Sequence, residues 1–142
     1  MNINIADCTY DDVFSILLTD TGWNERQYME ELTAKTARGL AARIDGCTVG
    51  VIFWRQAFEV AEITMLAVAP AWHRRGIARL LLKSMLKNLC ENGAHEILLE
   101  VRVSNTAARS LYLSAGFVEI AWRSLYYANP DEDALVMSLR LS

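Results

Sequence analysis

The segment LAVAPAWHRRGIARLLL, residues 66–82, joins an apolar strand-like run to an amphipathic helix through a basic turn. Pro70 ends the strand-like part, and Gly76 falls where the helical part begins. Such a strand–loop–helix offers unpaired backbone N–H groups to an anion such as a phosphate. The free N–H groups at a helix start carry partial positive charge and favour negative side chains, so positive side chains there are unfavourable. The segment alone therefore indicates either an anion site or a solvated basic turn. Its basic residues are Arg74, Arg75 and Arg79.

This turn matches neither of the common glycine-rich phosphate loops. A Walker loop requires Gly-Lys followed by Ser or Thr, and a dinucleotide-binding turn requires three glycines, whereas the turn holds only Gly76. Anion binding here would rest on backbone N–H groups and arginine side chains, which suit a small polyanion. Because the net charge of the chain is −3, we expect no nucleic acid partner.

The length and composition of the chain predict one globular domain over residues 1–142. Hydrophobic residues make up 53% of the 142 residues, which is enough for a packed core. No apolar run is long enough to span a bilayer, and the segment MNINIADCTYDD lacks the basic and apolar regions of a secretory signal. We therefore expect a cytoplasmic protein without a membrane partner, as a monomer or weak dimer.

The cysteines and histidines are too few and too widely spaced for a disulfide framework or a metal site. Cys8, Cys47 and Cys90 form no Cys-x-x-Cys pair, and their number is odd. We expect them to be buried free thiols. His73 and His95 have no ligand partner nearby in the sequence, so we predict no metal.

Hydrophobic periodicity and turn signals predict an α/β layered domain with the order β-α-α-β-β-β-α-β-α-β-β. Strands are expected over residues 3–7, 38–45, 47–56, 59–70, 95–103, 117–127 and 134–142. Helices are expected over residues 9–20, 24–35, 75–92 and 105–115, and a loop over residues 128–133.

Cap and turn residues support several of these boundaries. Thr9 resembles the cap of the first helix, and Asn24 with Gln27 resembles a capping box that opens the second. Trp23 directly precedes that box, where an apolar side chain can staple the helix start. The pair at residues 45–46, Asp-Gly, predicts a hairpin turn, and Gly93 is expected to end the third helix.

Several motifs in a fixed order resemble the GNAT acetyltransferases. The run at residues 73–78, His-Arg-Arg-Gly-Ile-Ala, resembles the acetyl-CoA signature of that family, Gln/Arg-x-x-Gly-x-Gly/Ala. Residues 99–117, LEVRVSNTAARSLYLSAGF, are similar to the second half of the family core. Residues 22–28, GWNERQY, and residues 122–139, WRSLYYANPDEDALVMSL, resemble the RimI-type ribosomal-protein-alanine N-acetyltransferases.

The resemblance implies the GNAT fold and an acetyl-CoA site. That fold is of the α/β (α+β) class, with a mixed, mostly antiparallel sheet of about seven strands and about four flanking helices. In the family, the turn holds the pyrophosphate of CoA, the preceding strand pairs with the pantetheine, and a later asparagine contacts the cofactor again. The matching residues here are Leu66, Ala67, Val68, Arg74, Arg75, Gly76, Ile77, Ala78, Arg79 and Asn105.

The same resemblance assigns two catalytic residues. Glu100 matches the proposed general base of the RimI-type branch, and Tyr112 matches the proposed general acid. Glu100 sits in the middle of a predicted strand among apolar neighbours, where desolvation would raise its pKa and make it a better base. An ordinary ion pair, with Arg102 or across strands, is equally compatible with the residues alone. A core aromatic with a bonded hydroxyl is the corresponding alternative for Tyr112.

The resemblance further implies that the acceptor is the α-amine of a protein N-terminus, in particular a ribosomal protein with N-terminal alanine. Trp23, Tyr126 and Asp133 are expected on the acceptor side, where an acidic rim would suit a basic peptide. A solvated hairpin loop remains the alternative for the acidic residues. An α-amine has a pKa of ~8 against ~10.4 for lysine, so a modest carboxylate base suffices.

Two other functions remain compatible with the sequence. One is acetyl transfer to a small-molecule amine or to lysine, and the other is a non-catalytic acyl-CoA-binding module. Glu100 and Tyr112 argue against the module, whereas His73 stands where the family usually has Gln or Arg. If that position acts through its backbone, the affinity for the cofactor changes little. If its side chain is needed, cofactor affinity falls or varies with pH.

Overall fold

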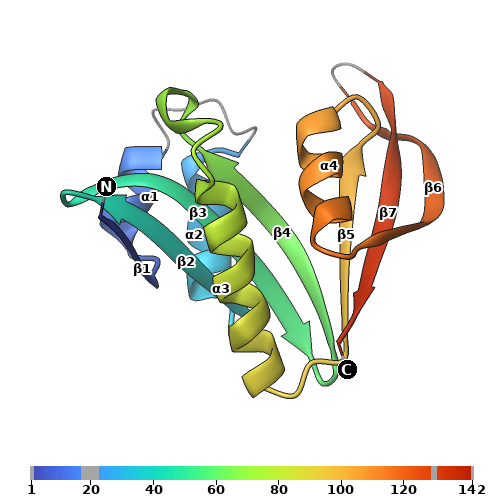
Figure 1. Ribbon diagram of the computed structural model, residues 1–142, viewed down its shortest axis with the longest axis horizontal. Helices are drawn as coiled ribbons and strands as arrows, with labels where there is room; N and C mark the ends of the chain where they lie inside the picture. The colour runs from blue at the N-terminus through green and yellow to red at the C-terminus, as the bar shows by residue number, and fades with distance from the viewer. Residues whose placement is uncertain (1, 17–22, 129–130, 142) are drawn as a thin grey trace.

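The computed structural model describes residues 2–16, 23–128 and 131–141. The element order of the described chain confirms the predicted one (Figure 1). The strands are β1 (Ile3–Asp7), β2 (Ala37–Ile44), β3 (Cys47–Ala57), β4 (Val60–Val68), β5 (Glu96–Arg102), β6 (Val118–Tyr127) and β7 (Glu132–Arg140). The helices are α1 (Tyr10–Ile16), α2 (Glu25–Thr33), α3 (Ile77–Glu91) and α4 (Thr106–Ser114), with a 3-10 turn, η1 (Pro70–Trp72), before α3.

The seven strands form one sheet in the order β1-β2-β3-β4-β5-β7-β6. Every pair is antiparallel except β4–β5, which is parallel, so the expected mixed and mostly antiparallel sheet is confirmed. The β4–β5 pairing is short and runs only from Val60–Glu96 to Glu62–Leu98. Beyond it the two strands diverge (Figure 1), which opens the sheet near its centre.

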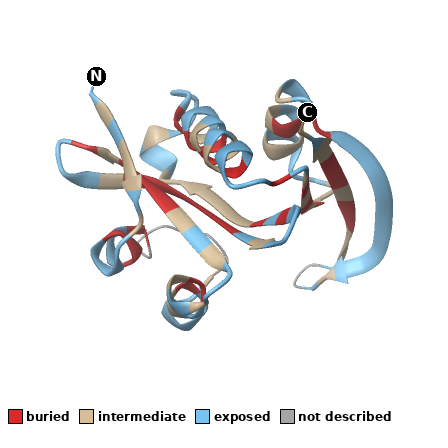
Figure 2. Cartoon of the chain, turned by 90° about the horizontal axis from the view of Figure 1, so that it is seen from below, coloured by how far each residue is buried: buried red, intermediate tan, exposed pale blue. Residues whose placement is uncertain are grey.

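The helices cover both faces of the sheet (Figure 2). Helices α3 and α4 lie on one face, over a core cluster that includes Leu81, Met85 and Leu99. Helices α1 and α2 lie on the other face, over a smaller cluster around Tyr28 and Phe53. The buried residues alternate along β5, as the sequence pattern predicts, so every second side chain of β5 points away from α3 and α4.

The local signals behave as expected. The Asn24 side chain accepts the Gln27 N–H and the Gln27 side chain accepts the Asn24 N–H, which completes the capping box. The ring of Trp23 lies 5.1 Å from that of Tyr28, the geometry of a hydrophobic staple. Thr9 caps α1 through a reciprocal pair of bonds with Asp12. The predicted end of this helix, residues 17–20, lies outside the described residues.

Three predictions of detail are wrong. Strand β7 already begins at Glu132, inside the predicted loop, because Glu132 pairs with Tyr127 across the hairpin. Helix α3 begins at Ile77, since Gly76 has a φ of 78° and cannot continue a right-handed helix. The cysteines are free but not buried: two of them are exposed and the third is half-buried. The exposed thiols are Cys47 and Cys90, and the half-buried one is Cys8.

No helix in the described part of the chain is long and apolar enough to cross a bilayer.

Candidate active site

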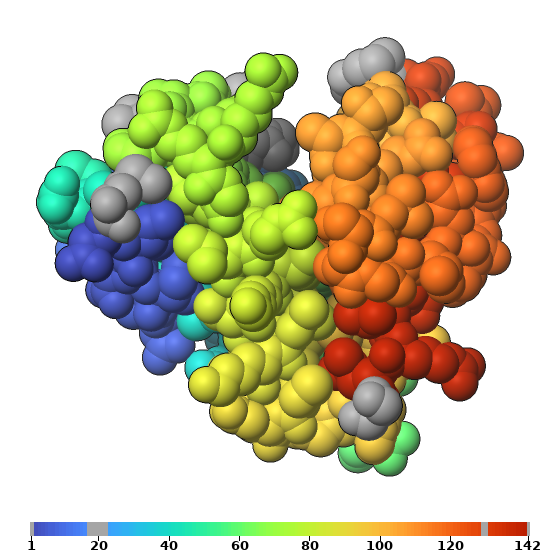
Figure 3. Space-filling model, viewed as in Figure 1, coloured from blue at the N-terminus to red at the C-terminus, as the bar shows by residue number. Residues whose placement is uncertain are grey.

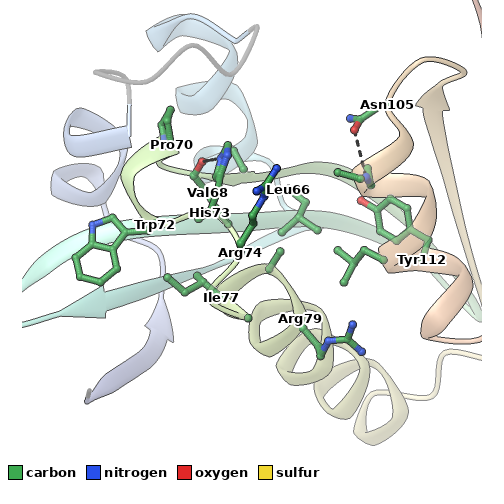
Figure 4. Close-up of a pocket in the computed structure, with 16 residues that line it drawn as sticks. Leu66, Val68, Pro70, Trp72, His73, Arg74, Ile77, Arg79, Asn105 and Tyr112 are labelled. Atoms are coloured by element: carbon green, nitrogen blue, oxygen red, sulfur yellow. Dashed lines mark hydrogen bonds between the residues drawn. The ribbon is translucent and has the colours of Figure 1, made fainter.

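A cavity of about 620 Å³ opens where β4 and β5 diverge. The space-filling view shows it as the hollow between the loop before α3 and helix α4 (Figure 3). Its lining comes from two segments of the chain, one from β4 to the first turn of α3 and the other from Asn105 to Tyr112 of α4 (Figure 4). These residues are Leu66, Ala67, Val68, Pro70, Trp72, His73, Arg74, Gly76, Ile77, Ala78, Arg79, Asn105, Ala107, Ala108, Leu111 and Tyr112.

The first wall of this cavity is an open strand edge. The Ala69 N–H donates to the Val49 carbonyl at 2.8 Å, so Val68 occupies a non-hydrogen-bonded position opposite Gly50. Val68 therefore directs its own N–H and C=O away from β3, and Leu66, two residues earlier, does the same. Because the pairing with β5 ends at Glu62, an extended chain in the cavity could bond to this edge.

The second wall is the start of α3, which has no side-chain cap. Arg74 and Gly76 both have positive φ, 63° and 78°, and the tight turn they form aims the first backbone N–H groups of the helix at the cavity. A Cβ atom on Gly76 would meet nothing within 4 Å, so the backbone conformation rather than space favours glycine here. The wall can thus hold an anion.

The arginines of the turn divide into two groups. Arg74 and Arg79 line the cavity (Figure 4), as predicted for a polyanion site. The guanidinium of Arg75 instead lies over the ring of Trp72, 5.0 Å from its centroid, and Arg75 is not among the lining residues. His73 also lines the cavity, with its ring against the Val68 carbonyl (Figure 4).

Helix α4 brings Asn105 and Tyr112 to the opposite side of the cavity (Figure 4). Asn105 is the N-cap of α4, and its Oδ1 accepts the Ala108 N–H at 3.2 Å. Tyr112 is 6% exposed, and burial raises the pKa of its phenol, so the hydroxyl keeps its proton at neutral pH. The cavity therefore contains a protonated phenol.

Glu100 lies on β5 but is not among the residues that line the cavity. The expectation of an apolar setting for it is wrong. Arg123 Nη1 donates to Glu100 Oε1 at 2.5 Å, and the pKa of the Tyr126 phenol is raised mainly by its hydrogen bond to Glu100. Of the two ion pairs considered from sequence, the one between strands forms, whereas Arg102 pairs with Glu132.

The residues predicted for the acceptor side fall in two places. Tyr126 and Asp133 belong to the β6–β7 hairpin, where Tyr126 contacts Glu100 and Asp133 Oδ1 accepts the Leu125 N–H at 2.8 Å. Trp23 packs over α2, against Tyr28 and the ring of Phe53 at 6.1 Å. The structure therefore brings Tyr126 to Glu100, whereas Asp133 bonds to the backbone of β6.

A family model for the acetyltransferase (GNAT) family matches residues 5–117. That match covers well over half of the 142 residues. The chain belongs to the GNAT acetyltransferase family.

Among GNAT relatives, the [ribosomal protein bS18]-alanine N-acetyltransferase of Escherichia coli K12 is 38% identical over 95 residues. These residues are 61% of this chain and 64% of the relative, so the chain spans less than two thirds of the length of that protein. An N-alpha-acetyltransferase from Sulfurisphaera tokodaii is 34% identical over 127 residues, which are 80% of this chain and 75% of the relative.

The GNAT fold is confirmed by solved structures as well. The crystal structure of the ribosomal-protein-S18-alanine N-acetyltransferase from Escherichia coli matches with a TM-score of 0.91 at 26% identity. The match covers 99% of this chain and 95% of that one. The seven strands and four helices described above thus occur in the same arrangement in a GNAT enzyme of the RimI type.

Two features of the site were missed at the level of sequence. Trp72 and Leu111 line the cavity, and each is a large apolar residue within two positions of a predicted site residue, Arg74 or Tyr112. Arg123 meets Glu100 across β7, a contact that no motif marks. No group of three or more His, Cys, Asp and Glu side chains that could hold a metal ion occurs among the described residues.

Proposed function

We propose that this chain transfers the acetyl group of acetyl-CoA to the α-amine of a protein N-terminus. The observation that carries the proposal is the meeting of three features in one cavity. They are the open edge of β4, the uncapped start of α3 and the protonated phenol of Tyr112. Membership of the GNAT family supports the reaction class.

The donor groups of the cavity fit acetyl-CoA, which joins a pyrophosphate to an extended chain with two amides. Backbone N–H groups at Gly76 and Ile77 suit the pyrophosphate, and Arg74 and Arg79 supply charge for it. The Val68 N–H and the backbone groups of Leu66, which point away from β3, suit an amide of the extended chain, whereas the Val68 carbonyl bonds to His73. When bound, acetyl-CoA supplies a thioester carbonyl for attack by an amine.

Glu100 and Tyr112 divide the proton transfers between them. Glu100 accepts the proton of the acceptor amine, directly or through a water molecule. Tyr112 donates the proton that the departing thiolate needs, since its buried hydroxyl is neutral at physiological pH. Tyr112 belongs to α4, which covers one face of the sheet, whereas Glu100 is on β5 and points away from α4. The divergence of β4 from β5 leaves the space in which amine and thioester meet.

The acidic groups near β6 and the names of the relatives support this acceptor class. Glu100 and Tyr126 meet beside Arg123 of β6, and Glu62 of β4 adds a further carboxylate there. Asp133 lies on the same hairpin as Tyr126. These groups suit a cationic N-terminus, and Trp23 extends the same side toward α2. The Escherichia coli relative is named for the alanine of ribosomal protein bS18, so an N-terminal alanine of a ribosomal protein is the first acceptor to test.

The test compares three peptides with acetyl-CoA and measures release of free thiol. One peptide begins with the first residues of bS18 and a free alanine amine, the second is its N-acetylated copy, and the third offers only a lysine amine. Release with the first peptide alone supports the proposal. Equal or faster release with the lysine peptide contradicts the acceptor class, and tight CoA binding without release from any peptide contradicts the reaction.

A further inference from the structure

The guanidinium of Arg123 rests on the carboxylate of Glu100. The distance from Arg123 Nη1 to Glu100 Oε1 is 2.5 Å, and the Arg123 guanidinium also lies 4.1 Å from the centroid of the Tyr126 ring. The Glu100 side chain is only 20% exposed, whereas that of Arg123 is 51% exposed. A cation that reaches in from the solvent therefore covers a carboxylate that is mostly enclosed.

An irregularity in β6 creates this contact. The register between β6 and β7 shifts between Arg123 and Tyr127, and Leu125 has a φ of 49°. In a regular strand, Arg123 and Tyr126 would point to opposite faces, because they are three residues apart. The bulge brings both side chains to Glu100, and β6 therefore supplies the cation and the phenol together.

The protonated α-amine of a peptide is also a cation with N–H donors, and it carries the same charge as Arg123. Both favour a carboxylate, and each repels the other at short range. The half-exposed guanidinium can return to water at little cost, because ion pairs of exposed side chains are weak. Glu62 on β4 also acts on Arg123, so a second carboxylate lies near the displaced guanidinium.

We propose that Arg123 is an internal substitute for the acceptor cation. Its guanidinium pairs with Glu100 until the N-terminal ammonium of the peptide displaces it. Arg123 thereby lowers the affinity for every cationic acceptor and selects those that bind well enough to displace it. It acts through Glu100 and is a positioning residue. This inference rests on the proposed function, since it takes Glu100 as the group that receives the amine.

The test measures peptide binding and turnover separately in Arg123→Gln, Arg123→Lys and Arg140→Gln. Arg140 is an exposed residue at the end of β7, so its replacement removes the same charge elsewhere on the neighbouring strand. Calorimetry with CoA present gives the Kd of the free-alanine peptide and of its N-acetylated copy. Turnover with acetyl-CoA gives KM and kcat.

We expect Arg123→Gln to bind the free-amine peptide about 3- to 5-fold more tightly, in keeping with the strength of a half-exposed ion pair. The N-acetylated peptide lacks the N-terminal ammonium that would displace Arg123, so its Kd should not change. Arg123→Lys should fall between wild type and Arg123→Gln, and Arg140→Gln should match wild type.

Weaker binding of both peptides to Arg123→Gln would overturn the inference, because it would make Arg123 a direct peptide contact or a structural residue. An unchanged Kd for the free-amine peptide would overturn it too. Failure of the proposed function gives a different pattern, in which no variant releases thiol from any peptide. The Kd comparison still decides the role of Arg123 in that case.

Discussion

The Nε2 atom of His73 lies 2.7 Å from the carbonyl oxygen of Val68, at the point where β4 ends. A carbonyl only accepts, so this ring nitrogen carries the proton of the bond. The bond ties the turn that holds Arg74 and Gly76 to the open edge of β4. The GNAT signature usually has Gln or Arg here, and both of these side chains also carry N–H donors. We therefore interpret His73 as a tether of the CoA-binding turn.

Replacement of His73 tests the tether. We expect His73→Ala to raise the Kd for CoA about 5-fold, the effect of one neutral hydrogen bond of ~1 kcal/mol. His73→Gln keeps a donor and should stay within about twofold of wild type, by the same reasoning. Calorimetric titration with CoA measures both values. Tighter binding by His73→Ala would show instead that the ring competes with the cofactor for the Val68 carbonyl.

Tyr112→Phe removes the hydroxyl assigned as the general acid and leaves the ring in the core. Because burial raises the pKa of this phenol, its proton is present throughout the neutral range, and its loss should lower kcat on the order of 100-fold. The Kd for CoA should change little, since binding rests on β4 and α3. Tyr10→Phe, which removes an exposed phenol bonded to Glu25, is the matched control. A kcat within twofold of wild type would assign the proton to another donor.

The sequence-based predictions that the structure confirms concern residues that lie close together along the chain. The capping box of Asn24 and Gln27 and the stop at Gly93 involve residues within one or two turns. The cofactor segment is likewise continuous from Leu66 to Arg79, so a motif can mark it. Such features are set by local backbone geometry and need no knowledge of the fold.

The contact between Arg123 and Glu100 depends on distant parts of the chain and could not be predicted in this way. It requires β7 to lie between β5 and β6, although β7 comes last in the sequence. It also requires the bulge near Leu125, which reverses the alternation expected for β6. The prediction of apolar surroundings for Glu100 is wrong for the same reason, because its charged partner, Arg123, lies two strands away in the sheet.

The bulge in β6 is held by Asp133, which accepts the N–H of Leu125 at 2.8 Å. Leu125 has a φ of 49°, a conformation that costs a non-glycine residue ~1 kcal/mol or more. Asp133→Ala should release the bulge and move Arg123 from Glu100, so it should lower the KM for the free-amine peptide about 3- to 5-fold, as Arg123→Gln does. Steady-state kinetics measure this effect, and the Kd for CoA should not change.

Two further variants test whether the bulge in β6 causes the change in the KM for the peptide. Leu125→Gly favours the positive φ of the bulge, so its addition to Asp133→Ala should restore part of the bulge and bring the KM part of the way back to the wild-type value. Asp131→Ala removes an exposed carboxylate from the same hairpin and should match wild type. If Asp131→Ala changes the KM as much as Asp133→Ala does, the loss of charge from the hairpin accounts for the effect.

Asp12 is a buried carboxylate on the far side of the sheet, 2% exposed, and it anchors α1 to the β2–β3 hairpin. Arg43 donates to both of its oxygens, at 2.8 and 2.5 Å, and Thr48 and Thr9 donate as well. Burial alone would raise the pKa of Asp12, but these hydrogen bonds outweigh it and hold the pKa well below its usual range. The ion pair of Asp12 and Arg43 therefore stabilises the fold through the charged form of Asp12.

Asp12→Asn should lower the free energy of unfolding by about 3 kcal/mol at pH 7, since it leaves the Arg43 charge with a neutral partner. In the wild type this contribution is complete above the pKa of ~3.9 of an unfolded aspartate and is lost as the pH falls toward the lower folded value. The gap between wild type and variant should therefore narrow below about pH 4. Urea unfolding at pH 7, 5, 4 and 3 measures this gap. Asp7→Asn is the control, since Asp7 is an exposed partner of Arg38. A gap that stays constant down to pH 3 would show that Asp12 stabilises the fold by shape and neutral hydrogen bonds and not by its charge.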